Sequence, residues 1–144
     1  MMARRSWVVF FLIAFTTLLA VAQDPKPEIK HAPAAQTSPA SGKEMFNAYC
    51  VACHGKDAKG DGPAASALKD APADLTMLAK THGGKYPLDR VTSVLRGQTK
   101  VGAHGTQEMP VWGPVFWKLS QGREVEVQQR IANLNRYIES LQVK

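Results

Sequence analysis

The strongest constraint on this chain is the pentapeptide CVACH at positions 50–54, which contains both of its cysteines and a histidine directly after the second. Three kinds of site use two thiols at this spacing. A redox dithiol opens a helix after a strand, and no run of alternating β-branched and aromatic residues precedes Cys50. A structural zinc site needs four ligands, and the chain has no second paired motif. The spacing therefore favours a third kind of site.

The third kind of site is covalent attachment of a haem, for which Cys-x-x-Cys-His is the signature. The thiols of Cys50 and Cys53 can each add to one of the two vinyl groups on neighbouring edges of a porphyrin. His54 is then held over the centre of the ring, where its imidazole can coordinate the iron. We therefore expect one covalently bound haem c, with disulfide exchange and zinc binding as the remaining alternatives.

An export signal is predicted over residues 1–22. Arg4 and Arg5 precede an almost wholly apolar run that begins at Trp7, and small residues follow up to Ala22. This order is typical of a secretory signal peptide that is cleaved after Ala22. The alternative is an uncleaved membrane anchor, although the run is shorter than the ~20 residues that span a bilayer. We expect the protein in the periplasm or another extracytoplasmic space, attached to the membrane if the signal is retained.

Residues 23–41 separate this signal from the rest of the chain. They carry prolines among Ala, Gln, Ser and Thr, and almost no large apolar residues. Such a stretch cannot bury enough surface to offset its ordering entropy, so we expect a flexible or extended linker. The folded domain is then residues 42–144. Lys and Arg are scattered, and the formal net charge of +6 favours acidic protein partners over nucleic acid.

Helical signals dominate the domain, and strand signals are sparse. Ser41 is a suitable N-cap for a helix that leads to the cysteines. A second helix is predicted over residues 88–96, between Pro87 and Gly97, and a third within residues 72–80. The last helix is indicated by apolar residues at steps of four and three, namely Val127, Ile131, Leu134, Ile138 and Leu141. We predict an all-α fold of four to five helices, with long loops wrapped around the haem.

Several segments of the domain resemble the class I cytochromes c, which are small exported electron carriers with one c-type haem. The resemblance covers residues 42–142. Besides the haem motif and the final helix, it rests on GKEMF at 42–46, GDGP at 60–63, PADLT at 72–76 and MPVWG at 109–113. The haem motif is highly specific when joined to the later Met-Pro and the last helix, whereas PADLT is only suggestive. The resemblance implies the cytochrome c fold.

The resemblance also implies that the second axial ligand of the iron comes from a loop before the last helix. Met109 matches this ligand, and the proline that follows restricts the backbone there. His104 is the alternative, because a haem with two histidine ligands is also stable. Met45 and Met77 are expected to pack in the interior, and His82 is expected to be a solvated loop residue.

The imidazole of His54 needs an acceptor for its other N–H group. In the family this acceptor is a backbone carbonyl of a Gly-Pro turn shortly after the haem motif, and Pro63 matches. A tight turn without this role is the simpler interpretation, and the two are compatible. The N–H or O–H groups of Tyr86, Trp112 and Trp117 could reach haem propionates, although packing is the alternative for all three and the more natural role of Trp117.

These expectations lead to one-electron transfer between exported or membrane-bound redox partners of a respiratory chain, by a monomeric haem domain. An axial thioether favours Fe(II) and raises the reduction potential. The chain has no paired carboxylates in a recognisable site, no nucleophile elbow and no phosphate loop, so we expect a carrier and not an enzyme. The alternatives are a dedicated haem subunit of a dehydrogenase or terminal oxidase, a peroxidase-like protein and a gas-binding protein.

Overall fold

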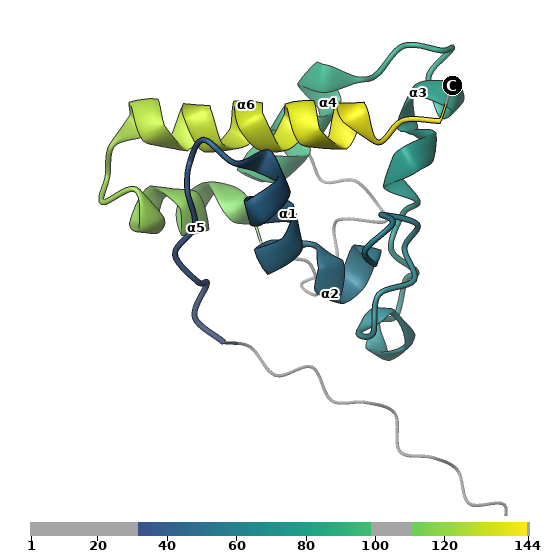
Figure 1. The fold of residues 1–144 in the computed structure, drawn as a ribbon, viewed down its shortest axis with the longest axis horizontal. Helices are drawn as coiled ribbons and strands as arrows, with labels where there is room; N and C mark the ends of the chain where they lie inside the picture. Colours follow the sequence, from purple (N-terminus) through teal and green to yellow (C-terminus); the bar gives the residue numbers. More distant parts are fainter. Residues whose placement is uncertain (1–31, 99–110, 144) are drawn as a thin grey trace, which may run out of the picture.

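The computed structural model of the protein describes residues 32–98 and 111–143 and is drawn in Figure 1. These residues form helices and no strand, which confirms the predicted all-α class. The α-helices are α1 (Gly42–Tyr49), α2 (Val51–His54), α3 (Leu78–Thr81), α4 (Leu88–Arg96), α5 (Trp112–Leu119) and α6 (Glu124–Ser140). Two short 3-10 helices, η1 (Ala65–Ala67) and η2 (Leu75–Met77), lie between α2 and α3. The structure therefore has more helices than the four to five predicted.

The predicted signal peptide lies outside the described residues, as does the first part of the predicted linker. Among the helices that the structure describes, none combines the length and the apolar character needed to cross a membrane.

Helices α1 and α6 cross each other closely, and α6 also runs along α5 (Figure 1). The predicted N-cap of α1 is confirmed, since the Ser41 hydroxyl accepts a hydrogen bond from the Glu44 amide at 3.2 Å. At the crossing, a Cβ atom on Gly42 would collide with the carbonyl group of Asn133 in α6. Glycine at this position therefore lets the two backbones approach. Next to it, the rings of Phe46 and Tyr137 pack with their centroids 5.4 Å apart.

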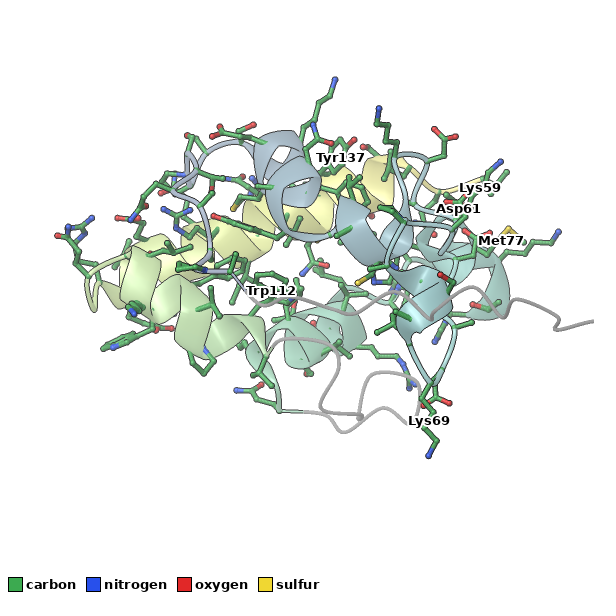
Figure 2. The ribbon with its side chains drawn as sticks, turned by 90° about the horizontal axis from the view of Figure 1, so that it is seen from below. Lys59, Asp61, Lys69, Met77, Trp112 and Tyr137 are labelled. Atoms are coloured by element: carbon green, nitrogen blue, oxygen red, sulfur yellow. The ribbon has the colours of Figure 1, made fainter. Side chains whose placement is uncertain are left out.

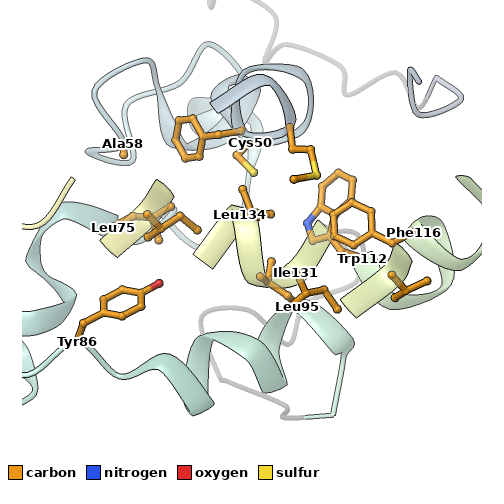
Figure 3. Close-up of a cluster of buried hydrophobic side chains, with 13 residues drawn as sticks. Cys50, Ala58, Leu75, Tyr86, Leu95, Trp112, Phe116, Ile131 and Leu134 are labelled. Carbon is orange, nitrogen blue, oxygen red and sulfur yellow. The ribbon is translucent and has the colours of Figure 1, made fainter. Parts of the chain in front are cut away.

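The long helix α6 presents the apolar face that the sequence predicts. Four members of the repeat are buried, and the fifth, Leu141, is the half-buried C-cap; the buried four are Val127, Ile131, Leu134 and Ile138. They form one cluster with residues of α1, α4 and α5 (Figure 3). The 3.6-residue period is thus sufficient to identify this helix and its buried side.

Helix α4 has the predicted bounds, and a buried polar network attaches it to α6. Gly97 ends the helix in the left-handed conformation, with φ at 74°. Asn135 of α6, which is 1% exposed, accepts a hydrogen bond from the Tyr86 hydroxyl at 2.8 Å. Its amide donates to the Thr92 hydroxyl at 2.9 Å. The side-chain amide of Asn135 can be buried because its oxygen and its nitrogen both have hydrogen-bond partners.

Two elements differ from the predictions. The helix predicted within residues 72–80 is replaced by η2 and the one-turn α3. Helix α5 was not predicted, because its sequence starts with Trp112, a glycine and a proline. Proline is tolerated in the first turn of a helix, where its missing N–H has no partner in any case. Packing of Trp112 and the fully buried Phe116 against the core then stabilises the helix.

The end of the predicted linker is docked on the domain. The guanidinium of Arg130 in α6, only 2% exposed, donates to the Thr37 carbonyl and hydroxyl, both at 3.0 Å. The Tyr49 hydroxyl donates to the Ala35 carbonyl at 2.6 Å, and the Asn133 amide donates to a further linker carbonyl at 2.8 Å. We call residues 35–39 the strap. The prediction of a free tether is wrong for the strap, because its backbone supplies acceptors that a buried arginine needs.

Candidate functional site

The residues of the CVACH motif lie where α1 gives way to α2. Cys50 is the C-cap of α1 and the N-cap of α2, and its amide donates to the Phe46 carbonyl at 2.9 Å. Helix α2 is a single turn that ends with His54, and the chain then turns away at Gly55, whose φ is 76°. Cys50 is buried with its sulfur directed into the core (Figure 3), whereas Cys53 is half-buried. One short turn therefore carries both thiols and the imidazole.

The two cysteines are not joined in a disulfide, and their surroundings do not activate them. Burial, with a smaller contribution from the charge of Cys53, raises the pKa of the Cys50 thiol to about 12. Burial also raises the pKa of Cys53. Cysteines that exchange disulfides have a lowered pKa, since the thiolate is the nucleophile. The protein environment alone thus gives no support to a redox dithiol.

Zinc binding has no support within the described ranges either. No group of three or more His, Cys, Asp or Glu side chains lies close enough together there to hold a metal ion. His82 is exposed at the end of α3, where its Nδ1 pairs with the Leu78 carbonyl at 2.8 Å. The predicted solvated position of this histidine is confirmed.

His54 is buried, with a backbone carbonyl beside its ring. Its Nδ1 lies 3.0 Å from the Ala73 carbonyl oxygen. Because a carbonyl oxygen can only accept, this contact places the proton on Nδ1 and the lone pair on Nε2. Burial lowers the pKa of His54, and the bond to Ala73 opposes this shift. The result is a neutral, oriented imidazole whose Nε2 has the electronic form of a metal ligand.

This geometry corrects the acceptor predicted for His54, which belongs to Ala73 and not to the turn at Pro63. The turn of residues 60–63 contributes amides instead of a carbonyl. Gly60 donates to the His54 carbonyl at 2.9 Å, and Gly62 donates to the Cys53 carbonyl at 3.0 Å. Pro63 itself is exposed. The amides of this turn therefore pair with carbonyls at the C-terminal end of α2 that have no partner within the helix. The turn contacts the backbone of the motif and not the imidazole ring of His54.

The Ala73 carbonyl is held by the start of η2. Asp74 caps this turn, accepting hydrogen bonds from the Thr76 amide at 2.9 Å and the Thr76 hydroxyl at 2.6 Å. The next amide, of Leu75, donates to the Ala58 carbonyl at 2.8 Å. The signal in the sequence was the PADLT stretch, in which a proline and an Asx-type cap mark a rigid turn. Nothing in the sequence of this stretch connects it to His54.

An apolar cavity opens beside the motif. Its empty volume is about 600 Å³ including the open mouth. Cys50 and His54 line it together with Arg90. The other lining residues are apolar and come from η2, α3, α4 and α6 and the loop before α4: Leu75, Leu78, Pro87, Val91, Val94, Leu95 and Ile138. The structure thus brings Cys50 and His54 to one cavity, and it adds Arg90, which had no distinguishing signal in the sequence.

The residues of this cavity fit a c-type haem. One thiol and one neutral imidazole of the motif line it, and the walls are apolar, as a porphyrin requires. Trp112 is not among the lining residues, but its indole is 6% exposed and the Nε1 atom has no hydrogen-bond partner among the described residues. In Figure 3 this nitrogen is on the side of the ring that faces Leu134 and the centre of the cluster. A buried donor without an acceptor is costly, and a bound polar group would remove that cost.

The remaining candidates are distributed as follows. Met109 and His104 lie outside the described residues. Met45 is fully buried in the core, as predicted, and Met77 is half-buried. Trp117 is 50% exposed, which does not match the packing role expected of it. The Tyr86 hydroxyl is engaged by Asn135 and is not available to a propionate.

Exposed lysines lie in the segment that follows the CVACH motif. Lys59 and Lys69 project from the end of the molecule that also carries Asp61 and Met77 (Figure 2). Lys56, Lys80 and Lys85 are exposed as well. Exposed cations of this kind attract acidic surfaces through long-range electrostatics.

Comparisons with known proteins give one match. The family model described as "Cytochrome C oxidase, cbb3-type, subunit III" matches residues 37–121. This range includes the haem motif, the Ala73 turn, α4 and the Met109 segment, and it starts within the strap. No curated protein and no solved structure matches the chain.

Proposed function

The chain belongs to the cytochrome family of cbb3-type oxidase subunit III, a family of c-type cytochrome domains, and on this premise we propose that it is a one-electron carrier with one covalently attached haem c. One observation carries the proposal: Cys50 and buried, neutral His54 line the same apolar cavity. An apolar cavity beside a Cys-x-x-Cys-His turn suits a haem, and neither a dithiol exchange site nor a zinc site requires one.

The side chains of the motif have separate roles in this proposal. Cys50 and Cys53 would form the two thioethers, and the Nε2 atom of His54 would coordinate the iron. A bound haem supplies an iron that cycles between the ferric and ferrous states. The Ala73 carbonyl at 3.0 Å from Nδ1 fixes the tautomer and the orientation of the imidazole. The apolar walls keep water away from the site.

Met109 is proposed as the second axial ligand, with the support of the Met-Pro sequence and of the family. A thioether is a soft ligand and favours the ferrous state. If His54 and Met109 both coordinated the iron, it would have no position open to a substrate, so we propose a carrier without enzymatic activity of its own. The N-terminal sequence supports an extracytoplasmic location, with redox proteins that present acidic surfaces as partners.

A second candidate is a haem-bearing subunit of a membrane-bound terminal oxidase, which the description of the matching family favours. The chemistry at the haem is the same for a free carrier and a subunit. The two differ in whether the protein stays bound to membranes. Purification from native membranes in mild detergent distinguishes them, because a subunit elutes with other polypeptides and a free carrier elutes alone.

The experiment that tests haem attachment uses the protein exported from a host with a haem c maturation system. We expect the mass to exceed that of the polypeptide from Gln23 onward by one haem, and acid-acetone to leave the pigment on the protein. Cys50→Ala and Cys53→Ala should each greatly reduce the yield of holoprotein. Ala52→Ser, an exposed position between the cysteines, is the matched control. Extractable haem, or a mass equal to the bare polypeptide, contradicts the proposal.

A further inference from the structure

Arg90 introduces a permanent charge into a cavity that is otherwise apolar. It lies on α4 and lines the cavity together with Cys50 and His54. Apart from the Cys50 thiol and the His54 imidazole, the other lining residues are apolar. Within the described residues, the guanidinium is therefore the one permanently charged group on the cavity wall.

The guanidinium of Arg90 differs from those of the other described arginines in having no partner. Arg96 pairs with Glu124 at 3.2 Å, and Arg136 donates to Asn133 at 2.7 Å. Arg123 and Arg130 are also engaged, both with Glu126. For Arg90 the described residues offer no ion pair and no hydrogen bond. Since an arginine beside an apolar surface gains most from a bidentate acceptor, the position is suited to an anion.

Arg90 is an exposed residue, but the helix that carries it is held in place. Helix α4 is attached to α6 by the bond between the hydroxyl of Thr92 and the buried amide of Asn135. Leu95, also on α4, lies across the core cluster from Cys50 (Figure 3). A group attached at Cys50 that filled the cavity would therefore reach α4, whose Arg90 is one of the lining residues.

We propose that Arg90 binds a propionate carboxylate of the haem and so positions the ring within the cavity. This inference rests on the proposed function. The macrocycle of a haem is apolar, but its two propionates are carboxylates and need polar partners. A planar guanidinium matches a carboxylate through two parallel hydrogen bonds. Arg90 is thus a positioning residue, acting on the cofactor and not on the iron.

The pairing has a consequence for the reduction potential. Reduction removes one positive charge from the iron, so nearby negative charge favours the ferric state and nearby positive charge favours the ferrous state. Without Arg90, a propionate would lose its compensating cation. The ferric state would then be favoured and the potential would fall. A role limited to packing would affect stability without this shift.

The test compares the reduction potentials of four holoproteins: wild type, Arg90→Gln, Arg90→Lys and Arg136→Gln. Arg136 is an exposed arginine of α6 that does not line the cavity, so its variant controls for the loss of one charge. We expect a lower potential for Arg90→Gln, a smaller decrease for Arg90→Lys, which keeps the charge but not the two parallel hydrogen bonds, and no shift for Arg136→Gln. A redox titration followed in the visible spectrum measures all four. Arg90→Gln should also lower the fraction of chains that carry haem.

The results separate this inference from the proposed function. If Arg90→Gln carries covalent haem and has the wild-type potential, or shifts only as much as Arg136→Gln, the role of Arg90 is overturned and the carrier function stands. If Arg90→Lys shifts as far as Arg90→Gln, the charge is not what matters, and the proposal fails as well. If the wild-type protein carries no covalent haem, both proposals fail together.

Discussion

Ala73 and Asp74 illustrate how a single turn orients a buried imidazole. The Ala73 carbonyl orients His54, and the Asp74 carboxylate holds the turn by accepting hydrogen bonds from both the amide and the hydroxyl of Thr76. A backbone carbonyl cannot be removed by substitution. Its position depends instead on the neighbouring side chain that caps the turn.

We predict that Asp74→Ala lowers the free energy of unfolding of the holoprotein by about 1 kcal/mol, the usual cost of losing such a cap. The cause is that the Thr76 amide and hydroxyl lose their acceptor. Denaturant unfolding followed by circular dichroism measures the change. Asp70→Ala is the control, because Asp70 is exposed and makes no hydrogen bond among the described residues. Equal stability of the two variants would refute the role of the cap.

A second prediction at the residue scale concerns Met109. Met109→Ala should lower the reduction potential, remove the weak red charge-transfer band of a Met-ligated ferric haem, and open the iron to carbon monoxide. The reason is the loss of a soft ligand that favours Fe(II). His104→Ala should leave all three properties nearly unchanged. The opposite pattern would replace the proposed ligand by His104 and indicate a low-potential cytochrome with two histidine ligands.

At the scale of elements, the strap connects three parts of the molecule. Its Thr37 hydroxyl accepts from Arg130 of α6 at 3.0 Å and lies 2.7 Å from the Tyr49 hydroxyl at the end of α1. The ring of Tyr49 packs in turn against Trp112 of α5, with centroids 5.2 Å apart. Because Tyr49 directly precedes Cys50, the strap supports the helix that carries the haem motif.

We predict that Thr37→Ala costs about 1 kcal/mol of stability, since a buried guanidinium loses one of its acceptors. Thr37→Ser should retain most of the wild-type stability, because it keeps the hydroxyl. Gln36→Ala, at the exposed neighbouring position, should have no effect. Thermal unfolding of the holoproteins provides the comparison. If Thr37→Ala and Gln36→Ala have equal melting temperatures, the strap contributes nothing through this side chain.

At the scale of the whole molecule, the cavity interrupts the hydrophobic core at the place that the proposed haem would fill. The cavity has an empty volume of about 600 Å³ including its mouth. Apolar space left unfilled in a core lowers the stability of a domain, and domains are stable by only ~5–15 kcal/mol. The polypeptide alone is therefore not expected to keep a well-packed core.

We accordingly predict that the double variant Cys50→Ala/Cys53→Ala, purified without haem, keeps helical far-ultraviolet circular dichroism but loses cooperative thermal unfolding. It should also bind the dye ANS, as expected for a compact state with loose packing. Ala52→Ser, which retains both thiols, should unfold cooperatively with its haem. A sharp, wild-type-like transition in the double variant would contradict the role of the cofactor in the core.

The sequence by itself determined the features that depend on local chemistry. The haem motif needs only the spacing of Cys50, Cys53 and His54. Capping residues and a 3.6-residue period were sufficient for α1, α4 and α6, because a helix end is decided by side chains within one turn. The all-α class followed from the same signals.

The tertiary structure decided the features that depend on contacts between distant segments. Every residue has a carbonyl, so no side chain distinguished Ala73 from Pro63 as the partner of His54. The strap appeared to be a linker because its composition offers no apolar surface, but its hydroxyl and carbonyls pair with the buried Arg130. Arg90 is an ordinary helix residue in the sequence, and only the packing of α4 places it at the cavity. In each case polar groups from segments far apart in the sequence pair with one another and stabilise the fold. Local sequence patterns do not reveal which of these groups will meet.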